Sequence, residues 1–317
     1  MGAIARKIGL LEVVSFLIFI FIMKFVHRYF GLLLILCCFA GLVVPSAGKN
    51  TSHIVIVALG SIIFCSFFQV SFSREALKSG FGLSLKFYLL RFIALPVIVF
   101  LAFRWISDFY APVLLLMFLL PAAVSSPSFT LLFGGRFDLS LKLLLISSFL
   151  SVITIPVLIS LLLGSAIHIQ PLNLLMTLVY TIVVPFLLHL PFRRWNLIKS
   201  IAGRYNALFT LVGLGIIFIA ATAKNKPAIL ADPAMVGLYI LEAFVLYSVL
   251  YLTGYFLFPA QTSDVRRTFS ISSGANNIGL GVTITALFFP GEMNIFFIVT
   301  QLVWVVMLIP LRRAMKL

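Results

Sequence analysis

The chain has 317 residues, of which 62% are hydrophobic and only 10% charged. Apolar runs of ~20 residues, long enough to cross a bilayer, recur along the whole sequence and exclude a soluble globular protein. The formal net charge of +15 lies mainly in short connections between these runs. It therefore indicates membrane orientation rather than a nucleic-acid partner. Because no zinc-ligand, phosphate-loop or nucleophile-elbow pattern occurs, we do not expect an enzyme.

Residues 1–28 form a separate N-terminal segment. Its run 9–23 is apolar apart from Glu12, and basic residues flank it on both sides. The pattern leaves open an extra transmembrane helix, an interfacial helix and an extension of the first helix. A cleaved signal peptide is disfavoured, because Lys24 follows without a small-residue cleavage site.

Ten transmembrane helices are predicted after residue 28, from apolar runs bounded by charge, Gly or Pro. They lie at 31–47, 53–72, 83–103, 109–133, 140–163, 172–192, 205–222, 234–258, 268–290 and 294–311. An even number of spans places both ends of this core on one side, and the positive-inside rule places that side in the cytosol.

The Lys and Arg residues in the connections test this topology. Fifteen fall on the cytosolic side: Lys24, Arg28, Arg74, Lys78, Arg136, Lys142, Arg193, Arg194, Lys199, Arg204, Arg266, Arg267, Arg312, Arg313 and Lys316. Four fall outside: Lys49, Arg104, Lys224 and Lys226. The asymmetry supports the ten-span prediction.

Two predicted spans are interrupted by small polar residues, at Pro121–Ser128 and at Ser270–Gly279. Such breaks are tolerated in a membrane only where they face protein or a water-filled cavity, and a matched pair predicts a transporter binding site. The candidate side chains are Ser125, Ser126, Ser128, Thr130, Ser272, Ser273, Asn276 and Asn277. The alternative is that the small residues only allow close helix packing.

The ten spans divide into halves of five, residues 29–170 and 171–317. Because five is odd, the second half enters the membrane from the opposite side, which predicts two inverted repeats. A faint sequence echo supports the division: an Ile-Pro pair follows each broken helix, at Ile155-Pro156 and Ile309-Pro310.

The stretch from Arg266 to Leu280, with Gly274, Asn277 and Gly279 in order, resembles the bile acid:sodium symporter family. The segments 68–77 and 121–140 resemble it as well, and the likeness covers residues 29–317. The auxin-efflux-like and arsenite carriers share this architecture. The resemblance implies a core domain with two crossed, discontinuous helices, a panel domain, an organic anion bound between them, and two sodium ions at the crossing.

The resemblance also assigns the ion ligands. The first site falls near Ser126, Pro127, Ser140 and Ser272, and the second near Arg91, Ser272, Ser273, Ala275 and Asn276. The family's glutamate aligns with Ser272, its asparagine with Pro127 and its glutamine with Arg91. A guanidinium ~4 Å from a sodium ion would repel it by about 4 kcal/mol at an effective dielectric of ~20. Two-sodium coupling is therefore not expected.

Two charges lie well inside predicted spans: Arg91 in the third, and Glu242 in the eighth, its counterpart in the repeat. Charges at that depth are usually paired or functional. We hypothesise that Arg91 takes the place of a sodium ion at the crossing, with Glu242 or the anionic substrate as its partner. The alternative is that Arg91 extends to the cytosolic interface. Asp138, between Arg136 and Lys142 at a predicted cytosolic turn, is expected to be a solvated charge or to form a local ion pair, with a proton-carrier role as the alternative.

These observations predict a secondary active transporter of organic anions, bile-acid-like or other carboxylates and sulfonates, working by alternating access. The alternatives are a proton-coupled or uncoupled exporter of the auxin-efflux type and a non-transporting membrane sensor. The expected partners are the lipid bilayer and a small organic anion, with sodium as the only cofactor that the resemblance implies. A bacterial inner membrane, with the core termini in the cytosol, is the expected location. The sequence carries no signal for oligomeric state.

Overall fold

The protein is described by a computed structural model that covers Phe25 and residues 29–46, 48–68, 80–164 and 170–315. Throughout these residues the regular structure is helical, apart from one isolated antiparallel bridge between Ala122 and Asn276. The run 9–23, for which three arrangements were left open, lies outside the described residues.

Five helical segments among the described residues are long and apolar enough to cross a membrane. They are Phe81–Phe103, Phe137–Leu163, Pro171–Phe192, Asn196–Ala231 and Pro233–Phe256. Shorter apolar helices are Tyr29–Val43, Thr51–Phe67, Tyr110–Leu119 and Ile278–Phe288. The prediction of an all-helical, polytopic membrane protein is confirmed. The count of ten spans, the domain division and the inverted repeat stay predictions.

Two of the long segments widen into a π-helix in the middle. One consists of α4 (Phe81–Tyr88), a π-helix (Leu89–Ala94) and α5 (Leu95–Phe103). The other consists of α9 (Pro171–Leu178), a π-helix (Val179–Val183) and α10 (Val184–Phe192). In both, a proline, Pro96 or Pro185, follows two residues after the π-helix. Because proline lacks an N–H and crowds the carbonyl four residues earlier, the chain there favours the wider turn.

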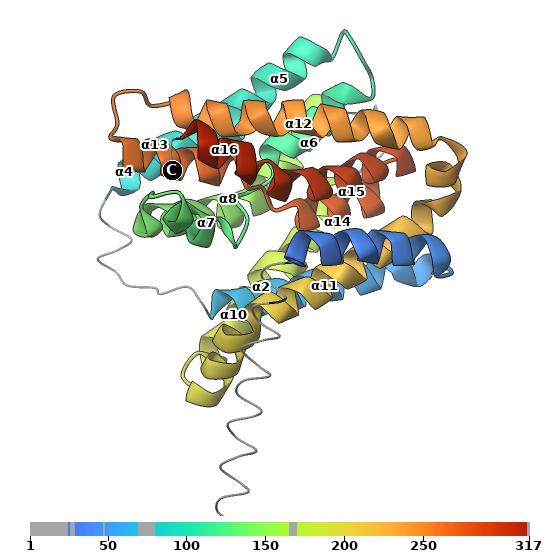
Figure 1. The fold of residues 1–317 in the computed structure, drawn as a ribbon, viewed down its shortest axis with the longest axis horizontal. Coiled ribbons are helices and arrows are strands. Elements are labelled where there is room, and N and C mark those ends of the chain that lie inside the picture. Colours follow the sequence, from blue (N-terminus) through green and yellow to red (C-terminus); the bar gives the residue numbers. More distant parts are fainter. Residues whose placement is uncertain (1–24, 26–28, 47, 69–79, 165–169, 316–317) are drawn as a thin grey trace, which may run out of the picture.

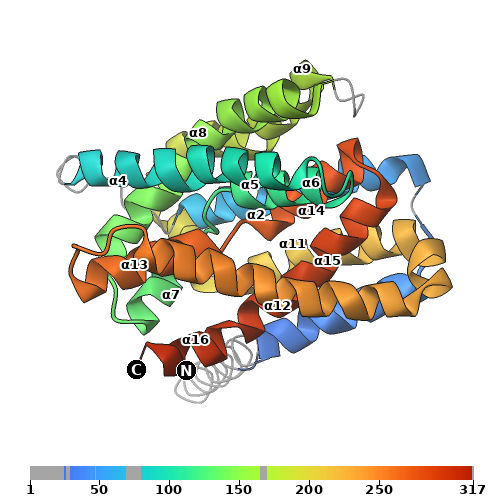
Figure 2. The same ribbon diagram turned by 90° about the horizontal axis from the view of Figure 1, so that it is seen from above.

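The helices lie in two groups. Tyr29–Val43, α2 (Thr51–Phe67), α10 and α11 (Asn196–Ala231) form the lower group in Figure 1, which we call the α2 layer. On the opposite side lie α12 (Pro233–Phe256) and α13 (Ser263–Gly274), with α4, α5 and α6 (Tyr110–Leu119) beside them (Figure 2). Between the groups lie α8 (Phe137–Leu163) and α14 (Ile278–Phe288).

The boundaries of two predicted spans are corrected. The seventh, predicted at 205–222, is the longer α11, because the helix continues through polar residues beyond the apolar run on both sides. The tenth, predicted at 294–311, is divided into α15 (Gly291–Val306) and α16 (Leu308–Ala314). Pro310 lacks the N–H that the carbonyl of Val306 would accept in a continuous helix, so the division falls four residues before it.

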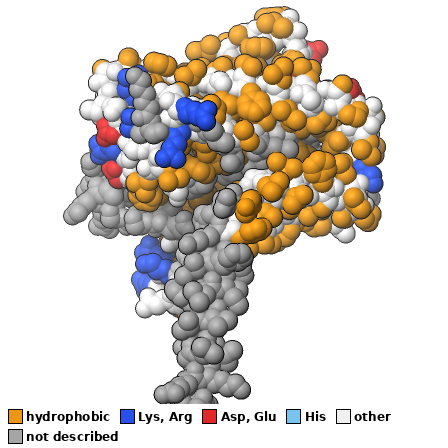
Figure 3. All heavy atoms as spheres, viewed as in Figure 1, with side chains coloured by type: hydrophobic (Ala, Val, Ile, Leu, Met, Phe, Trp, Pro, Cys, Tyr) orange, Lys and Arg blue, Asp and Glu red, His pale blue; other side chains and the backbone are white. Residues whose placement is uncertain are grey.

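The surface fits a bilayer. On α8, Ile153, Val157 and Leu161 are 61%, 54% and 74% exposed and recur every fourth residue, while Ile155 and Ile159 are buried. Such a stripe faces an apolar medium rather than water. Hydrophobic side chains cover most of the face shown in Figure 3, and Lys and Arg gather mostly at one end of it.

Candidate functional site

The two interrupted segments cross each other at their breaks, as predicted. One break separates α6 (Tyr110–Leu119) from α7 (Ser126–Leu132), and the other separates α13 from α14. The Ala123 N–H donates to the Ala275 carbonyl at 2.6 Å, and the Asn277 N–H donates to the Pro121 carbonyl at 2.8 Å. Each unwound strand thus pairs with the other, which satisfies backbone groups that lipid cannot. We call residues 120–125 and 275–277 the crossover.

Side chains from neighbouring helices support the crossover. The Asn276 amide donates to the Met117 carbonyl at 2.8 Å, and the Ser147 hydroxyl accepts from the Ala122 N–H at 3.1 Å. Asn277 caps α14, since its Oδ1 accepts from the Leu280 N–H at 3.2 Å. Asn276 and Asn277 therefore have separate tasks, one at the crossing of the strands and one at the start of the helix.

Arg91 lies at the crossover and is fully buried. Its Nε donates to Ser273 Oγ at 2.6 Å, its Nη2 to the Ser273 carbonyl at 2.7 Å and more weakly to Asn276 Oδ1 at 3.5 Å. Nη1 donates to the Phe118 carbonyl at 2.8 Å, so one guanidinium ties both broken segments together. The Phe92 and Phe118 rings lie 4.7 and 5.2 Å from it, within the range of cation–π attraction. The alternative that Arg91 extends to the interface is wrong.

The predicted pairing of Arg91 with Glu242 is corrected. Glu242 accepts a hydrogen bond from the Tyr110 hydroxyl, at the start of α6, whereas Arg91 binds the carbonyl of Phe118 at its end. Eight helical residues separate these points by about 12 Å. The ion pairs of the described residues do not include Arg91, and oxygens of neutral groups are its hydrogen-bond partners. Within the described part of the chain, the cation is therefore held without a neutralising carboxylate.

A second polar cluster, made of hydroxyls, lies beside the crossover. Thr130 Oγ1 donates to Ser140 Oγ at 3.0 Å, and Ser140 Oγ lies 3.3 Å from Ser272 Oγ. All three side chains are fully buried. Ser126 is buried as well, and its hydroxyl has no hydrogen-bond partner among the described residues. These four residues form the hydroxyl cluster.

The remaining candidates lie elsewhere. Ser128, the third residue of α7, is exposed and lies outside both the crossover and the hydroxyl cluster. Ser125 is half-buried at the N-terminus of α7. Ser273 belongs with Arg91, and its hydroxyl also donates to the Leu250 carbonyl of α12 at 2.6 Å.

Two glycines that sequence reasoning did not single out for packing fix this arrangement. A Cβ on Gly254 of α12 would lie 2.3 Å from the Phe269 carbonyl of α13. A Cβ on Gly274 would lie 2.3 Å from the Tyr251 ring. The glycines let α12 and α13 approach closely enough for Ser273 to reach Leu250.

A narrow cavity borders the crossover, between the α2 layer and α8. Its lining is mostly apolar, with Ser66, Ser148 and Asn277 as polar residues. It is lined by Ile63, Ser66, Phe67, Val124, Leu144, Leu145, Ser148, Ile182 and Asn277. Asn277 is the residue next to the Arg91 ligand Asn276, so the cavity meets the positive end of α14 near a buried cation.

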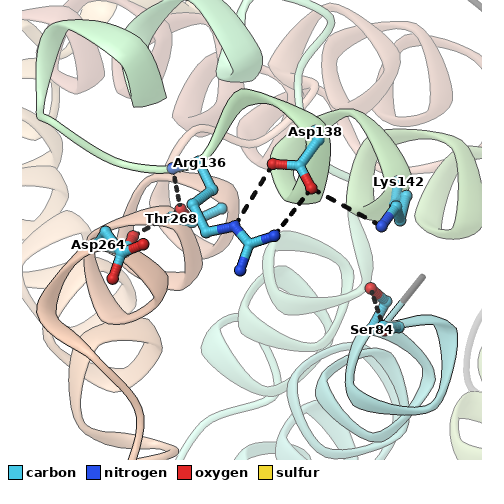
Figure 4. A network of polar contacts seen from close by, with 7 residues as sticks. Ser84, Arg136, Asp138, Lys142, Asp264 and Thr268 are labelled. Atoms are coloured by element: carbon cyan, nitrogen blue, oxygen red, sulfur yellow. Dashed lines mark hydrogen bonds and ion pairs between the residues drawn. The ribbon is translucent and has the colours of Figure 1, made fainter. Parts of the chain in front are cut away.

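A third polar network, at the turn from α7 to α8, holds that turn against α13 (Figure 4). The Arg136 N–H donates to Thr268 Oγ1 at 2.7 Å, and the Arg136 side chain pairs with Asp138 at 3.1 Å. Lys142 Nζ lies 3.9 Å from the same carboxylate. The predicted local pairing of Asp138 is confirmed.

Comparison with known proteins identifies the family. The model of the Sodium Bile acid symporter family matches residues 56–232, more than half of the chain. The chain belongs to this family. It is also 24% identical over 190 residues to the uncharacterized protein YbaS of Bacillus subtilis strain 168. That alignment spans 57% of this chain and 61% of the relative. Membership supports a membrane transporter of the bile acid/sodium symporter kind. The family match includes the first break and ends before the second.

The residues present do not fit sodium at the second implied position. There the oxygens of Ser273 and Asn276 accept hydrogen bonds from the Arg91 guanidinium, which is itself a cation. At the first position, neutral hydroxyls bind one another where the resemblance implies a carboxylate.

Proposed function

We propose that this protein is a secondary active transporter of organic anions in which Arg91 permanently occupies the place of a coupling sodium ion. The observation that carries the proposal is the four-bond clamp of the buried guanidinium on both broken segments. A bound sodium ion would hold the same oxygens only while it is present. Arg91, whose charge is permanent, holds them in every state of the cycle.

The charge balance at the crossover favours an anionic substrate. Arg91 has neutral oxygens as its hydrogen-bond partners, and the N-terminus of α14 adds a partial positive charge beside the same cavity. The cavity wall is largely apolar, with Asn277, Ser66 and Ser148 as polar groups. An amphipathic carboxylate or sulfonate suits this combination of apolar surface and positive potential. The cavity has a volume of about 20 Å³ in this conformation, room for about one water, so it must widen to admit such a substrate.

A buried polar contact supports alternating access. Asn225 of α11 donates to Asn294 of α15 at 2.6 Å, and Lys224 donates to the Ala286 carbonyl of α14 at 2.5 Å. These bonds join α11 of the α2 layer to α14 and α15, at the end that the charge distribution predicts to be outside. Opening of the cavity toward that side requires them to break, while the crossover itself stays intact.

The test is uptake of radiolabelled taurocholate, as a probe amphipathic anion, into proteoliposomes in sodium chloride or choline chloride at equal ionic strength. We expect uptake above that of protein-free liposomes and equal in both salts. Asn277→Ala, at the cavity and the α14 cap, should reduce uptake, whereas Ser128→Ala, on an exposed side chain, should not.

Uptake that rises saturably with sodium would overturn the proposed role of Arg91. An absence of uptake, together with no stabilisation of the purified protein by taurocholate or other bile acids, would contradict the amphipathic-anion assignment. If the broken-helix variants changed a cellular response while no anion was carried, the sensor alternative would replace the transporter.

A further inference from the structure

Glu242 is an ionisable side chain inside a membrane span to which neither the family match nor the crossover gives a role. It is the tenth residue of α12, about 13 Å from the helix start. One carboxyl oxygen, Oε1, accepts a hydrogen bond from the Tyr110 hydroxyl of α6. The other, Oε2, is buried and has no hydrogen-bond partner among the described residues.

This arrangement suits a protonated carboxyl better than an ionised one. A carboxylate is an acceptor with about four lone-pair positions, and burial of the charge beside a single donor is costly. The described ion pairs include no cation at Glu242. Protonation removes the charge and leaves Oε1 free to accept from Tyr110, so the apolar surroundings of α12 favour the neutral group.

The neighbouring groups offer a route for a proton. Tyr110 also lines an open pocket on the surface, together with Tyr239 of α12, Glu292 at the start of α15 and Asp232 before α12. Tyr239 donates to Glu292 at 2.9 Å, so Glu292 already has a donor and is exposed to water. Tyr110 therefore connects the pocket to the buried carboxyl of Glu242.

We propose that Glu242 is a proton-binding site of this transporter, loaded through Tyr110 from the open pocket. A proton from water adds to the Tyr110 oxygen as the tyrosine's own proton passes to Glu242. The tyrosine stays neutral and the carboxylate becomes a carboxylic acid, so atoms and charge balance. Release reverses the two transfers. The proton site is inferred from the contacts of Glu242 alone, whereas the coupling of this proton to transport rests on the function proposed above.

The helix α12 connects Glu242 to the crossover. Leu250, eight residues after Glu242 on the same helix, accepts the hydroxyl of Ser273, which in turn binds Arg91. Any shift of α12 against α6 that accompanies a change of charge at Glu242 moves this contact as well. The crossover of this chain would thus be held by a fixed cation and driven by a proton.

The experiment is an infrared pH titration of the purified protein, following the carbonyl stretching band of protonated carboxylic acids. Wild type should show the band of the protonated Glu242 carboxyl. Glu242→Gln, which keeps an oxygen to accept from Tyr110, should abolish that band. Glu292→Gln, the matched control at the tyrosine-bound carboxylate in the open pocket, should leave it in place.

Tyr110→Phe gives a second readout. It removes the hydrogen bond to the carboxyl of Glu242, so the carbonyl stretching band should move to higher frequency in this variant. A wild-type band that Glu242→Gln leaves unchanged, or a band frequency that Tyr110→Phe does not move, would overturn the proton site.

Transport is scored separately, with a pH-sensitive dye inside taurocholate-transporting proteoliposomes. Loss of dye response in Glu242→Gln supports coupling. A titrating Glu242 in a protein that carries no anion would leave the site standing and reject the transport proposal. Taurocholate transport without a titrating Glu242 would support the transport proposal and reject the proton site.

Discussion

The two polar clusters at the crossover organise the same backbone in different ways. Around Arg91, a single cation donates four hydrogen bonds to both broken segments. In the hydroxyl cluster, Thr130, Ser140 and Ser272 join α7, α8 and α13 through neutral contacts, and the Ser126 hydroxyl has no partner among the described residues. In the function that we propose, one implied ion position holds the guanidinium of Arg91, and the other holds neutral hydroxyls where the resemblance implies a carboxylate.

The largest expected effect comes from removing the charged cluster. Arg91→Met leaves the carbonyls of Phe118 and Ser273 buried without a donor, which should lower the free energy of unfolding by about 3 kcal/mol or more. Arg91→Lys keeps the charge but cannot reproduce the planar fork, so it should fall between methionine and wild type. The thermal unfolding midpoints of the three proteins in detergent should rank wild type first, Arg91→Lys second and Arg91→Met last. Equal midpoints for wild type and Arg91→Met would show that the clamp does not stabilise the fold.

Two substitutions together can move the charge from one cluster to the other, by removing the cation at position 91 and adding a carboxylate at position 272. The double variant Arg91→Gln, Ser272→Glu removes the cation and restores the carboxylate that the resemblance implies. It should gain a stabilisation by sodium of about 2.7 kcal/mol at one hundred times its dissociation constant. Wild type and each single variant serve as controls in sodium and choline chloride. A double variant as indifferent to sodium as wild type would mean that other residues prevent ion binding.

The packing that positions Ser273 is tested by adding one methyl group. Gly254→Ala forces a Cβ against the Phe269 carbonyl, and overpacking of this kind costs about 1–3 kcal/mol. Gly237→Ala in the same helix is the matched control, since a Cβ there meets nothing within 4 Å. It should be neutral or slightly stabilising. Similar unfolding midpoints for the two alanine variants would contradict the close approach of α12 and α13.

The smallest effect is expected in the neutral cluster. Ser140→Ala removes the acceptor of the Thr130 hydroxyl and should cost about 1 kcal/mol. Ser128→Ala, at an exposed side chain of α7, should change stability by less than about 0.5 kcal/mol. If Ser140→Ala were as damaging as Arg91→Met, the hydroxyl cluster would hold more than the hydrogen bonds seen here, and a bound ion would be the first explanation to test.

Sequence reasoning found the breaks because they are local: small polar residues within an apolar run are costly unless the helix is interrupted there. It found Arg91 for the same reason, since a charge inside a span stands out. It could not assign the partners. Glu242 was paired with Arg91 by repeat symmetry, yet its donor is Tyr110, which no sequence pattern connects to it. Ser147, the Met117 carbonyl and Gly254 carry no signal of their own, because their roles depend on which helix packs beside them.

The sequence by itself determined the membrane class, the two interrupted helices and the presence of a charge among them, since these follow from the cost of polar groups in hydrocarbon. The tertiary structure alone decided that the charge clamps both breaks, that the Ser128 side chain is exposed, and that Glu242 accepts a hydrogen bond from a tyrosine. Hydrogen-bond partners far apart in sequence are chosen by the angles and close approaches of packed helices, such as that of α12 on α13. Hydropathy along the chain does not encode those angles.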